Sequence, residues 1–288
     1  MKTLSDFQKD LRAIREILGL SQKELALELG VTNVTISLWE EGKTAPTSSK
    51  QDEIYDFAFK RDVRLNEAKA QLFMDASNQN TSILFHGAKT GIDFPLDLKH
   101  SKRSNDLGPG FYAGEGYEQA ATYVAAYPSP TLYAFSFANS QSLRVMSLDV
   151  NFEWMIAVAY FRGYLKAYGQ NEAILSLARK IEESDLIIAP IADNSMYEII
   201  GSFATGQITD EQCKHSLAAN HLGKQYVFKS ERAINGLKLI STMRICPLEK
   251  KELLAKKAKA TELGLGKVNL AKIEYRGKGR YVEELFRA

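Results

Sequence analysis

Apolar and polar residues follow two different periods along this chain, and the change falls near residue 81. Before that point, apolar residues recur at helical spacing, as in Leu11, Ile14 and Leu18, and the runs stop at glycines. This pattern predicts a set of short helices over residues 4–60 and one more helix over 65–76.

After residue 81, short β-type runs alternate irregularly with helical segments. Strands are expected at 82–85, 132–137, 186–191, 226–229 and 237–240, and helices at 117–126, 152–168, 173–183 and 210–222. Without a regular strand-helix alternation, the mixture predicts an α+β fold rather than a doubly wound sheet.

The patterning therefore divides the chain into four parts. These are an all-α bundle over residues 1–64, a connector over 65–81, an α+β domain over 82–248 and a basic C-terminal extension over 249–288. The extension is rich in Lys and Arg, and glycines at 264, 266, 277 and 279 are expected to break it.

Composition limits the classes of function. The formal net charge of the 288 residues is +2, so DNA binding must rest on a local motif rather than on overall charge. Cys213 and Cys246 are too few for a disulfide framework and lack metal-ligand spacing, so no metal is expected. No apolar run approaches the ~20 residues of a membrane helix. A cytoplasmic protein without a membrane contact is the expectation.

The helical bundle carries strong boundary signals. Ser21 and Glu24 have the spacing of a capping box, Gly30 is placed to end the second helix, and Thr32 can cap a third helix. Ile36 and Trp39 would face inward from that third helix. Residues 6–60 resemble the helix-turn-helix domain of phage-repressor regulators of the Cro/C1 (XRE) type.

This resemblance implies a protein that binds double-stranded DNA at its own operator, as a homodimer on a palindromic site. Asn33, Val34 and Ser37 would face base edges, whereas Gln22, Lys43 and Thr44 would lie at phosphates. A helix-turn-helix used only for protein contact stays open as the alternative.

A second group of residues suggests chemistry. An apolar run ends in His86-Gly87, the segment Gly108-Pro-Gly-Phe-Tyr112 follows, and a helix-like segment ends in Tyr123. An imidazole beside two phenol rings would build an aromatic-walled slot that suits a flat, electron-poor ring such as nicotinamide.

With Gln225, these residues resemble the three motifs of ADP-ribosyltransferases of the His-Tyr-Glu class, over residues 82–240. The resemblance implies an ADP-ribosyltransferase-like split β-sandwich and NAD as the substrate. His86 would bind the adenosine-side ribose, the Gly87 backbone the nicotinamide amide, and Gln225 the nicotinamide-ribose 2′-hydroxyl, while Tyr112 and Tyr123 would enclose the ring.

One departure from that class matters. The third motif usually supplies a glutamate, whereas Gln225 carries no charge and is no useful base. Glu115, Glu118 and Glu231 are spare carboxylates, any of which could supply the missing base, and Glu231 is the one expected to do so. Asp193 either faces the same cleft or caps the next helix.

The sequence as a whole predicts a DNA-binding regulator fused to an NAD-dependent ADP-ribosyltransferase or NAD glycohydrolase, as in a single-chain toxin–antitoxin or defence module. The acceptor of ADP-ribose is open: protein, nucleic acid or water. The alternative is a catalytically silent transcription factor whose C-terminal domain senses NAD or ADP-ribose.

Overall fold

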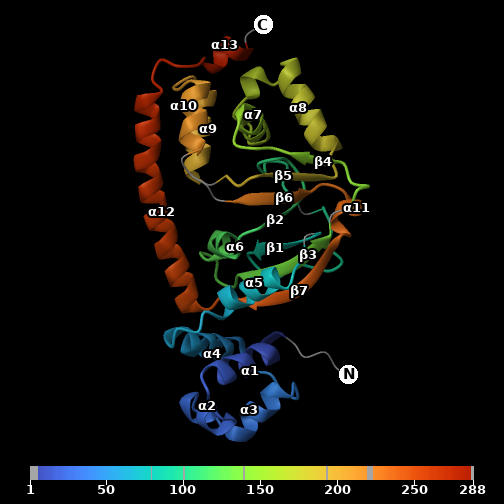
Figure 1. The fold of residues 1–288 in the computed structure, drawn as a ribbon, viewed down its shortest axis with the longest axis vertical. Helices are drawn as coiled ribbons and strands as arrows, with labels where there is room; N and C mark the ends of the chain where they lie inside the picture. The colour runs from blue at the N-terminus through green and yellow to red at the C-terminus, as the bar shows by residue number, and fades with distance from the viewer. Residues whose placement is uncertain are drawn as a thin grey trace.

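The computed structural model describes residues 6–78, 80–99, 101–138, 140–192, 194–218 and 223–286. A small helical region at the N-terminus is followed by a larger region built on a seven-stranded mixed sheet (Figure 1). None of the helices in these ranges has the length and apolarity needed to span a membrane.

The N-terminal region consists of short helices at the predicted places. They are α1 (Asp6–Ile17), α2 (Gln22–Glu28), α3 (Asn33–Glu40), α4 (Ser48–Lys60) and α5 (Leu65–Asp75). The first three each end at a glycine in the left-handed region, Gly19 (φ 65), Gly30 (φ 63) and Gly42 (φ 71), where other residues are strained.

The predicted helix caps are present. The Ser21 hydroxyl accepts from the Glu24 amide, and the Glu24 carboxylate accepts from the Ser21 amide. Thr32 caps α3 by accepting from the amide of Thr35. These bonds satisfy backbone donors that a helix start leaves unpaired, so local sequence fixes the α2–α3 corner.

The second region holds one sheet in the order β4-β5-β6-β2-β1-β3-β7. Its strands are β1 (Thr81–Ala88), β2 (Phe111–Gly114), β3 (Thr131–Ala138), β4 (Val145–Ser147), β5 (Leu186–Pro190), β6 (Lys224–Phe228) and β7 (Leu237–Arg244). Only the β4–β5 pair is parallel, and every other pair within the described strands is antiparallel.

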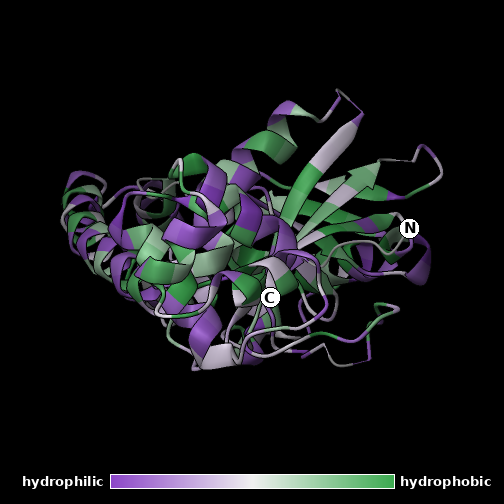
Figure 2. Cartoon of the chain, turned by 90° about the horizontal axis from the view of Figure 1, so that it is seen from below, coloured by the Kyte–Doolittle hydropathy of each residue, from purple (hydrophilic) through white to green (hydrophobic). Residues whose placement is uncertain are grey.

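Helices cover the sheet. They are α6 (Tyr117–Val124), α7 (Phe152–Phe161), α8 (Glu172–Glu183), α9 (Asn194–Ala204), α10 (Asp210–Ala218), α11 (Glu231–Ile234), α12 (Pro247–Glu274) and α13 (Val282–Phe286), with a 3-10 turn at Lys166–Tyr168. In Figure 2 the helices carry hydrophobic and hydrophilic residues together, as expected for helices that bury one face.

Two separate apolar clusters pack helices against the sheet. One apolar cluster joins α6, α5 and α12 to β1, β3 and β7, through Phe85, Ala121 and Met243. Another joins α7, α9 and α10 to β5 and β6, through Ile187 and Val227. Between these two clusters lie β2 and the start of β6, and the candidate site is found there.

Several strand limits differ from the prediction, and β7 continues to Arg244 instead of ending at residue 240. The sequence pattern ends the first strand at Phe85, but β1 continues through Ala88 because His86 and Gly87 pair with Tyr133 and Leu132 of β3. The strands β2 and β4 have four and three residues and were not predicted, since such short runs carry little periodicity.

The C-terminal extension is also different from the prediction. Gly264 and Gly266 do not break it, because both lie inside the 28-residue helix α12. Each interior glycine costs roughly 1 kcal/mol relative to alanine. Burial of Val268 and Ala271 where α12 packs against α10 offsets that cost. The helix runs along one side of the sheet region (Figure 1).

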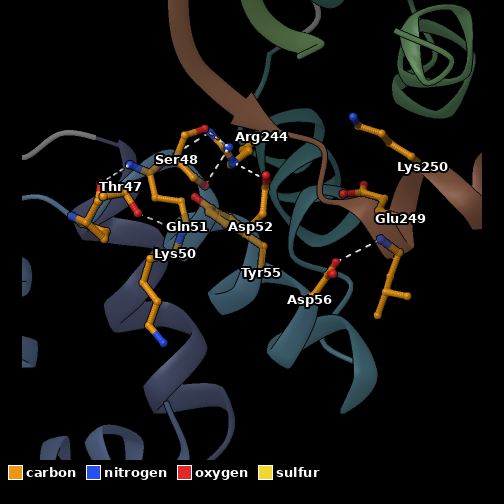
Figure 3. A network of polar contacts seen from close by, with 12 residues as sticks. Thr47, Ser48, Lys50, Gln51, Asp52, Tyr55, Asp56, Arg244, Glu249 and Lys250 are labelled. Carbon is orange, nitrogen blue, oxygen red and sulfur yellow. Dashed lines mark hydrogen bonds and ion pairs between the residues drawn. The ribbon is translucent and has the colours of Figure 1, made fainter. Parts of the chain in front are cut away.

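The two regions are tied together at the end of β7. The Arg244 guanidinium donates to Asp52 (2.8 Å) and to the Ser48 hydroxyl (2.6 Å) on α4, as Figure 3 shows. Nearby, Asp56 accepts from the Leu248 amide, and Cys246 is buried in the core of the helical region. The expected limit between residues 248 and 249 therefore falls inside α12, whose start belongs to this junction.

Candidate functional site

A cavity of about 620 Å³ opens where β1 and β2 separate. The two strands pair at Phe85 and Gly114, and they diverge beyond that position. The cavity is lined from both diverging strands, from the start of β6, from α6 and α9, and from the loop between β1 and β2. This volume lies in the range of small-molecule and cofactor sites, ≈ 300–1,000 Å³.

His86 bridges the separated strands. Its Nδ1 lies 2.7 Å from the backbone oxygen of Tyr112, and its ring stacks on Phe111 with 4.5 Å between ring centres. Burial lowers the pKa of His86, which favours the neutral ring near neutral pH. Because a carbonyl can only accept, Nδ1 carries the proton and Nε2 is left as an acceptor.

Gly87 is required by packing. A Cβ at this position would lie 2.5 Å from the backbone oxygen of Ala120 and 3.0 Å from Val124, so α6 lies directly against the strand. The absence of a side chain therefore explains the close helix approach. It also leaves the Gly87 backbone at the cavity wall.

Tyr112 and Tyr123 both line the cavity, but they are held differently. The Tyr112 hydroxyl donates to the Gly108 oxygen (2.6 Å) and accepts from the Leu107 amide (3.1 Å). This fixes the ring and the glycine turn together, and burial raises the pKa of Tyr112. Tyr123, on α6, is 64% exposed, so its ring lines the cavity on a side that is open to solvent.

Gln225 pairs across the sheet with Gly114 on one side and with Ala189 on the other. Its side chain is buried, and Nε2 donates to the Pro190 oxygen at 2.9 Å. That bond uses one of the two N–H donors of the amide, so the other N–H and the acceptor Oε1 remain for a ligand hydroxyl.

A charged cluster at the same cavity was not predicted from the sequence. Asp106 is buried and accepts two hydrogen bonds from Arg162, from Nε (2.8 Å) and Nη2 (2.6 Å). The Tyr197 hydroxyl donates to the same carboxylate at 2.9 Å and lies 3.0 Å from the Ala192 oxygen. All three side chains line the cavity, but the residues are far apart in sequence and have no shared spacing.

One expected carboxylate does not line the cavity. Glu231 is in the first turn of α11, beyond the far end of β6 from Gln225, and it is not among the residues that line the cavity. Its expected role beside Gln225 is therefore wrong. Asp193 lies outside the described residues. The side chains His86, Tyr112, Tyr123 and Gln225 do meet at one cavity, together with the Gly87 backbone.

The candidate DNA interface lies at the opposite end of the molecule. In Figure 1, α2 and α3 are the elements farthest from the sheet. Asn33 and Val34 at the start of α3 are exposed, as are Lys43 and Thr44 after it. The surface expected to meet DNA is therefore not covered by the sheet region.

Carboxylates hold several of the expected DNA contacts in place. Glu41 accepts from the Ser37 hydroxyl (2.9 Å) and pairs with Lys43 (2.6 Å), and these bonds, Lys43 first, lower the pKa of Glu41. The Gln22 amide donates to buried Glu40 at 2.8 Å. Lys43 keeps further N–H donors, and the Ser37 oxygen can still accept, so both remain able to meet DNA while bonded to Glu41.

Comparisons with known proteins match both regions. The family described as Helix-turn-helix matches residues 11–50, and the family described as Protein of unknown function (DUF3990) matches residues 82–239. No curated protein and no solved structure matches the chain. The N-terminal match confirms the predicted helix-turn-helix and indicates a DNA-binding regulator.

Proposed function

The chain belongs to the DUF3990 family, and from that premise we propose that its second region cleaves NAD and transfers ADP-ribose under the control of a DNA-binding regulator. The sequence resemblance to ADP-ribosyltransferases, with their split β-sandwich, motivates the proposal. The observation that carries it is the convergence of His86, Tyr112, Tyr123 and Gln225, with the Gly87 backbone, on one cavity of about 620 Å³.

The atoms at this cavity suit the proposed roles. The Nε2 acceptor of His86 takes a hydroxyl of the adenosine-side ribose, and Oε1 of Gln225 takes the 2′-hydroxyl of the nicotinamide ribose. The nicotinamide ring stacks between the fixed ring of Tyr112 and the exposed ring of Tyr123.

In the reaction, the bond between nicotinamide and ribose C1′ breaks, and its electron pair leaves with the nicotinamide. A lone pair of the acceptor forms the new bond to C1′, and the acceptor proton passes to solvent. Gln225 supplies a carbonyl dipole rather than a full charge to the oxocarbenium-like ribose. Catalysis then depends on positioning of the substrate. The reaction should be slower than in an ADP-ribosyltransferase that has a glutamate at this position.

The helix-turn-helix would place this activity under control of the operator. Asn33, Val34 and Ser37 read base edges, and Gln22, Lys43 and Thr44 fix the register on phosphates. A homodimer on a palindromic operator, with half-sites about 34 Å apart, is the arrangement proposed. Such a chain would act in the cytoplasm as a single-chain toxin–antitoxin or defence module.

The test is nicotinamide release from labelled NAD by the full chain. His86→Ala and Tyr112→Ala are expected to abolish it. Tyr164→Ala is the matched control, since Tyr164 is 40% exposed and does not line the cavity. Equal release by all three variants and the parent protein would refute the proposed site.

A second function is favoured by Gln225 itself. With its amide bonded to the Pro190 oxygen and no carboxylate in its place, the cavity suits a ligand sensor that does not turn NAD over. Operator binding that shifts with NAD or ADP-ribose, without nicotinamide release, would identify this sensor.

A further inference from the structure

Hydrogen bonds fix the backbone around Arg162, the arginine of the charged cluster. Arg162 follows the last turn of α7, where Gly163 takes φ 79. The Gly163 amide donates to the Tyr160 oxygen (2.9 Å) and the Tyr164 amide to the Ala159 oxygen (2.8 Å), so the helix end is closed by two bonds. A cation at the carboxyl end of a helix is also electrostatically favoured.

Its side chain is fixed as well. Both bonds to Asp106 leave from Nε and Nη2, so Nη1 takes no part in that pair. The guanidinium carbon lies 3.8 Å from the centre of the Tyr197 ring. Since the carboxylate and the ring have already ordered the guanidinium, a ligand that binds it loses little further side-chain entropy.

Among the residues that the structure describes, three cationic side chains line the cavity: Lys89, Lys102 and Arg162. The two lysines are exposed, and Lys89 lies over the Tyr127 ring. The side chain of Arg162 is 31% exposed, and it is the cation anchored to a buried partner. The cavity therefore has an ordered positive group about which an anion can be positioned.

We propose that Arg162, oriented by Asp106 and Tyr197, is the subsite of this cavity that binds a pyrophosphate group. The inference rests on the proposed function, because it assigns the negatively charged middle of the dinucleotide to this wall. A planar guanidinium matches phosphate oxygens in geometry and charge. Asp106 and Tyr197 are positioning residues here, since they act through the arginine.

The experiment is calorimetric titration of the full chain with inorganic pyrophosphate, ADP and adenosine. Arg162→Gln is expected to weaken pyrophosphate and ADP roughly 10-fold or more while adenosine is unchanged. Because Arg162→Gln alone leaves Asp106 buried without its cation, Asp106→Asn/Arg162→Gln is measured too and must give the same loss. Arg179→Gln, which removes a surface arginine paired with Glu172, is the control and is expected to change nothing.

Asp106→Asn alone gives the sign that separates the possibilities. It removes the negative charge but keeps a side-chain oxygen that can accept from Arg162 Nε and Nη2. The guanidinium therefore stays oriented, and pyrophosphate is expected to bind several-fold more tightly because no carboxylate competes for it. The proposal is overturned if Asp106→Asn weakens pyrophosphate as Arg162→Gln does, if the double variant binds like the parent protein, or if the parent protein binds neither pyrophosphate nor ADP.

Nicotinamide release by the parent protein separates this proposal from the proposed function. Arg162-dependent ADP binding without release supports the subsite and refutes ADP-ribosyl transfer. Release with pyrophosphate affinity unaltered in Arg162→Gln supports the transfer and refutes the subsite.

Discussion

Replacing Gly87 by alanine tests whether the wall between β1 and α6 is as tight as the structure indicates. The added Cβ would lie 2.5 Å from the Ala120 oxygen, and real Cβ contacts shorter than 3.0 Å are essentially never observed. The helix must therefore retreat by about half an ångström or more, and overpacking of this kind costs about 1–3 kcal/mol. Since α6 carries Tyr123, the cavity wall moves with it.

Gly91→Ala is the matched control. Gly91 also lines the cavity, but its added Cβ would lie 3.7 Å from the Tyr133 hydroxyl, an ordinary contact. Both substitutions reduce the freedom of the unfolded chain by about 0.4–1 kcal/mol, so their difference isolates the steric cost.

Thermal unfolding followed by circular dichroism measures that difference. At about 2–4 °C per kcal/mol, Gly87→Ala should unfold roughly 2–12 °C below Gly91→Ala. Equal midpoints would refute the packing argument, and an unchanged NAD affinity in Gly87→Ala would refute the coupling of α6 to the cavity.

Three further predictions concern other parts of the chain. Asn33→Ala should weaken operator binding in a gel-shift assay by roughly 10-fold or more, since a base contact contributes ≈ 1–3 kcal/mol. The control Lys60→Ala changes an exposed residue at the end of α4 and should have no effect. Equal affinities of the two variants would contradict the assigned recognition face. Gln225→Glu should lower the unfolding free energy by about 1–3 kcal/mol at neutral pH, because a carboxylate cannot donate to the Pro190 oxygen. The loss should shrink in acid, where the carboxyl can donate again, and a pH-independent loss in urea titrations would contradict this. Burial raises the pKa of Glu249, and this effect is larger than the lowering by hydrogen bonds from its neighbours. The charged carboxylate therefore destabilises the fold at pH values above the unfolded-state pKa. Glu249→Gln should therefore be more stable than the parent protein near neutral pH, and the two should converge as the pH falls toward the unfolded-state pKa; a gap that widens in acid would be the wrong sign.

The helical region was predictable because its signals are local. The Ser21 capping box and the glycines at 19, 30 and 42 each act within a few residues, so spacing alone reveals them. The long helix α12 was not predictable in this way. Its interior glycines argue against a helix, and only packing against distant elements outweighs them.

Part of the candidate site could likewise be predicted from local motifs, and part of it could not. His86 and Tyr112 lie in short motifs, so the sequence could group them, and the structure brings them to one cavity. The cluster of Asp106, Arg162 and Tyr197 joins a loop, the end of α7 and α9. Its partners are separated by dozens of residues, and no spacing rule connects them. Glu231, by contrast, follows the strand expected at 226–229 whereas Gln225 precedes it, so the sequence already placed the two residues at opposite ends of that strand.

The covering of β7 has a consequence for any attempt to study the sheet region alone. This strand is at the edge of the sheet, and Asp6 accepts a hydrogen bond from the amide of Thr242 on it. Edge strands with unpaired backbone groups serve as templates for other chains. A fragment that starts near residue 80 would lose this cover and the helical core around Cys246. It should therefore aggregate, and insolubility of such a fragment would say nothing about toxicity.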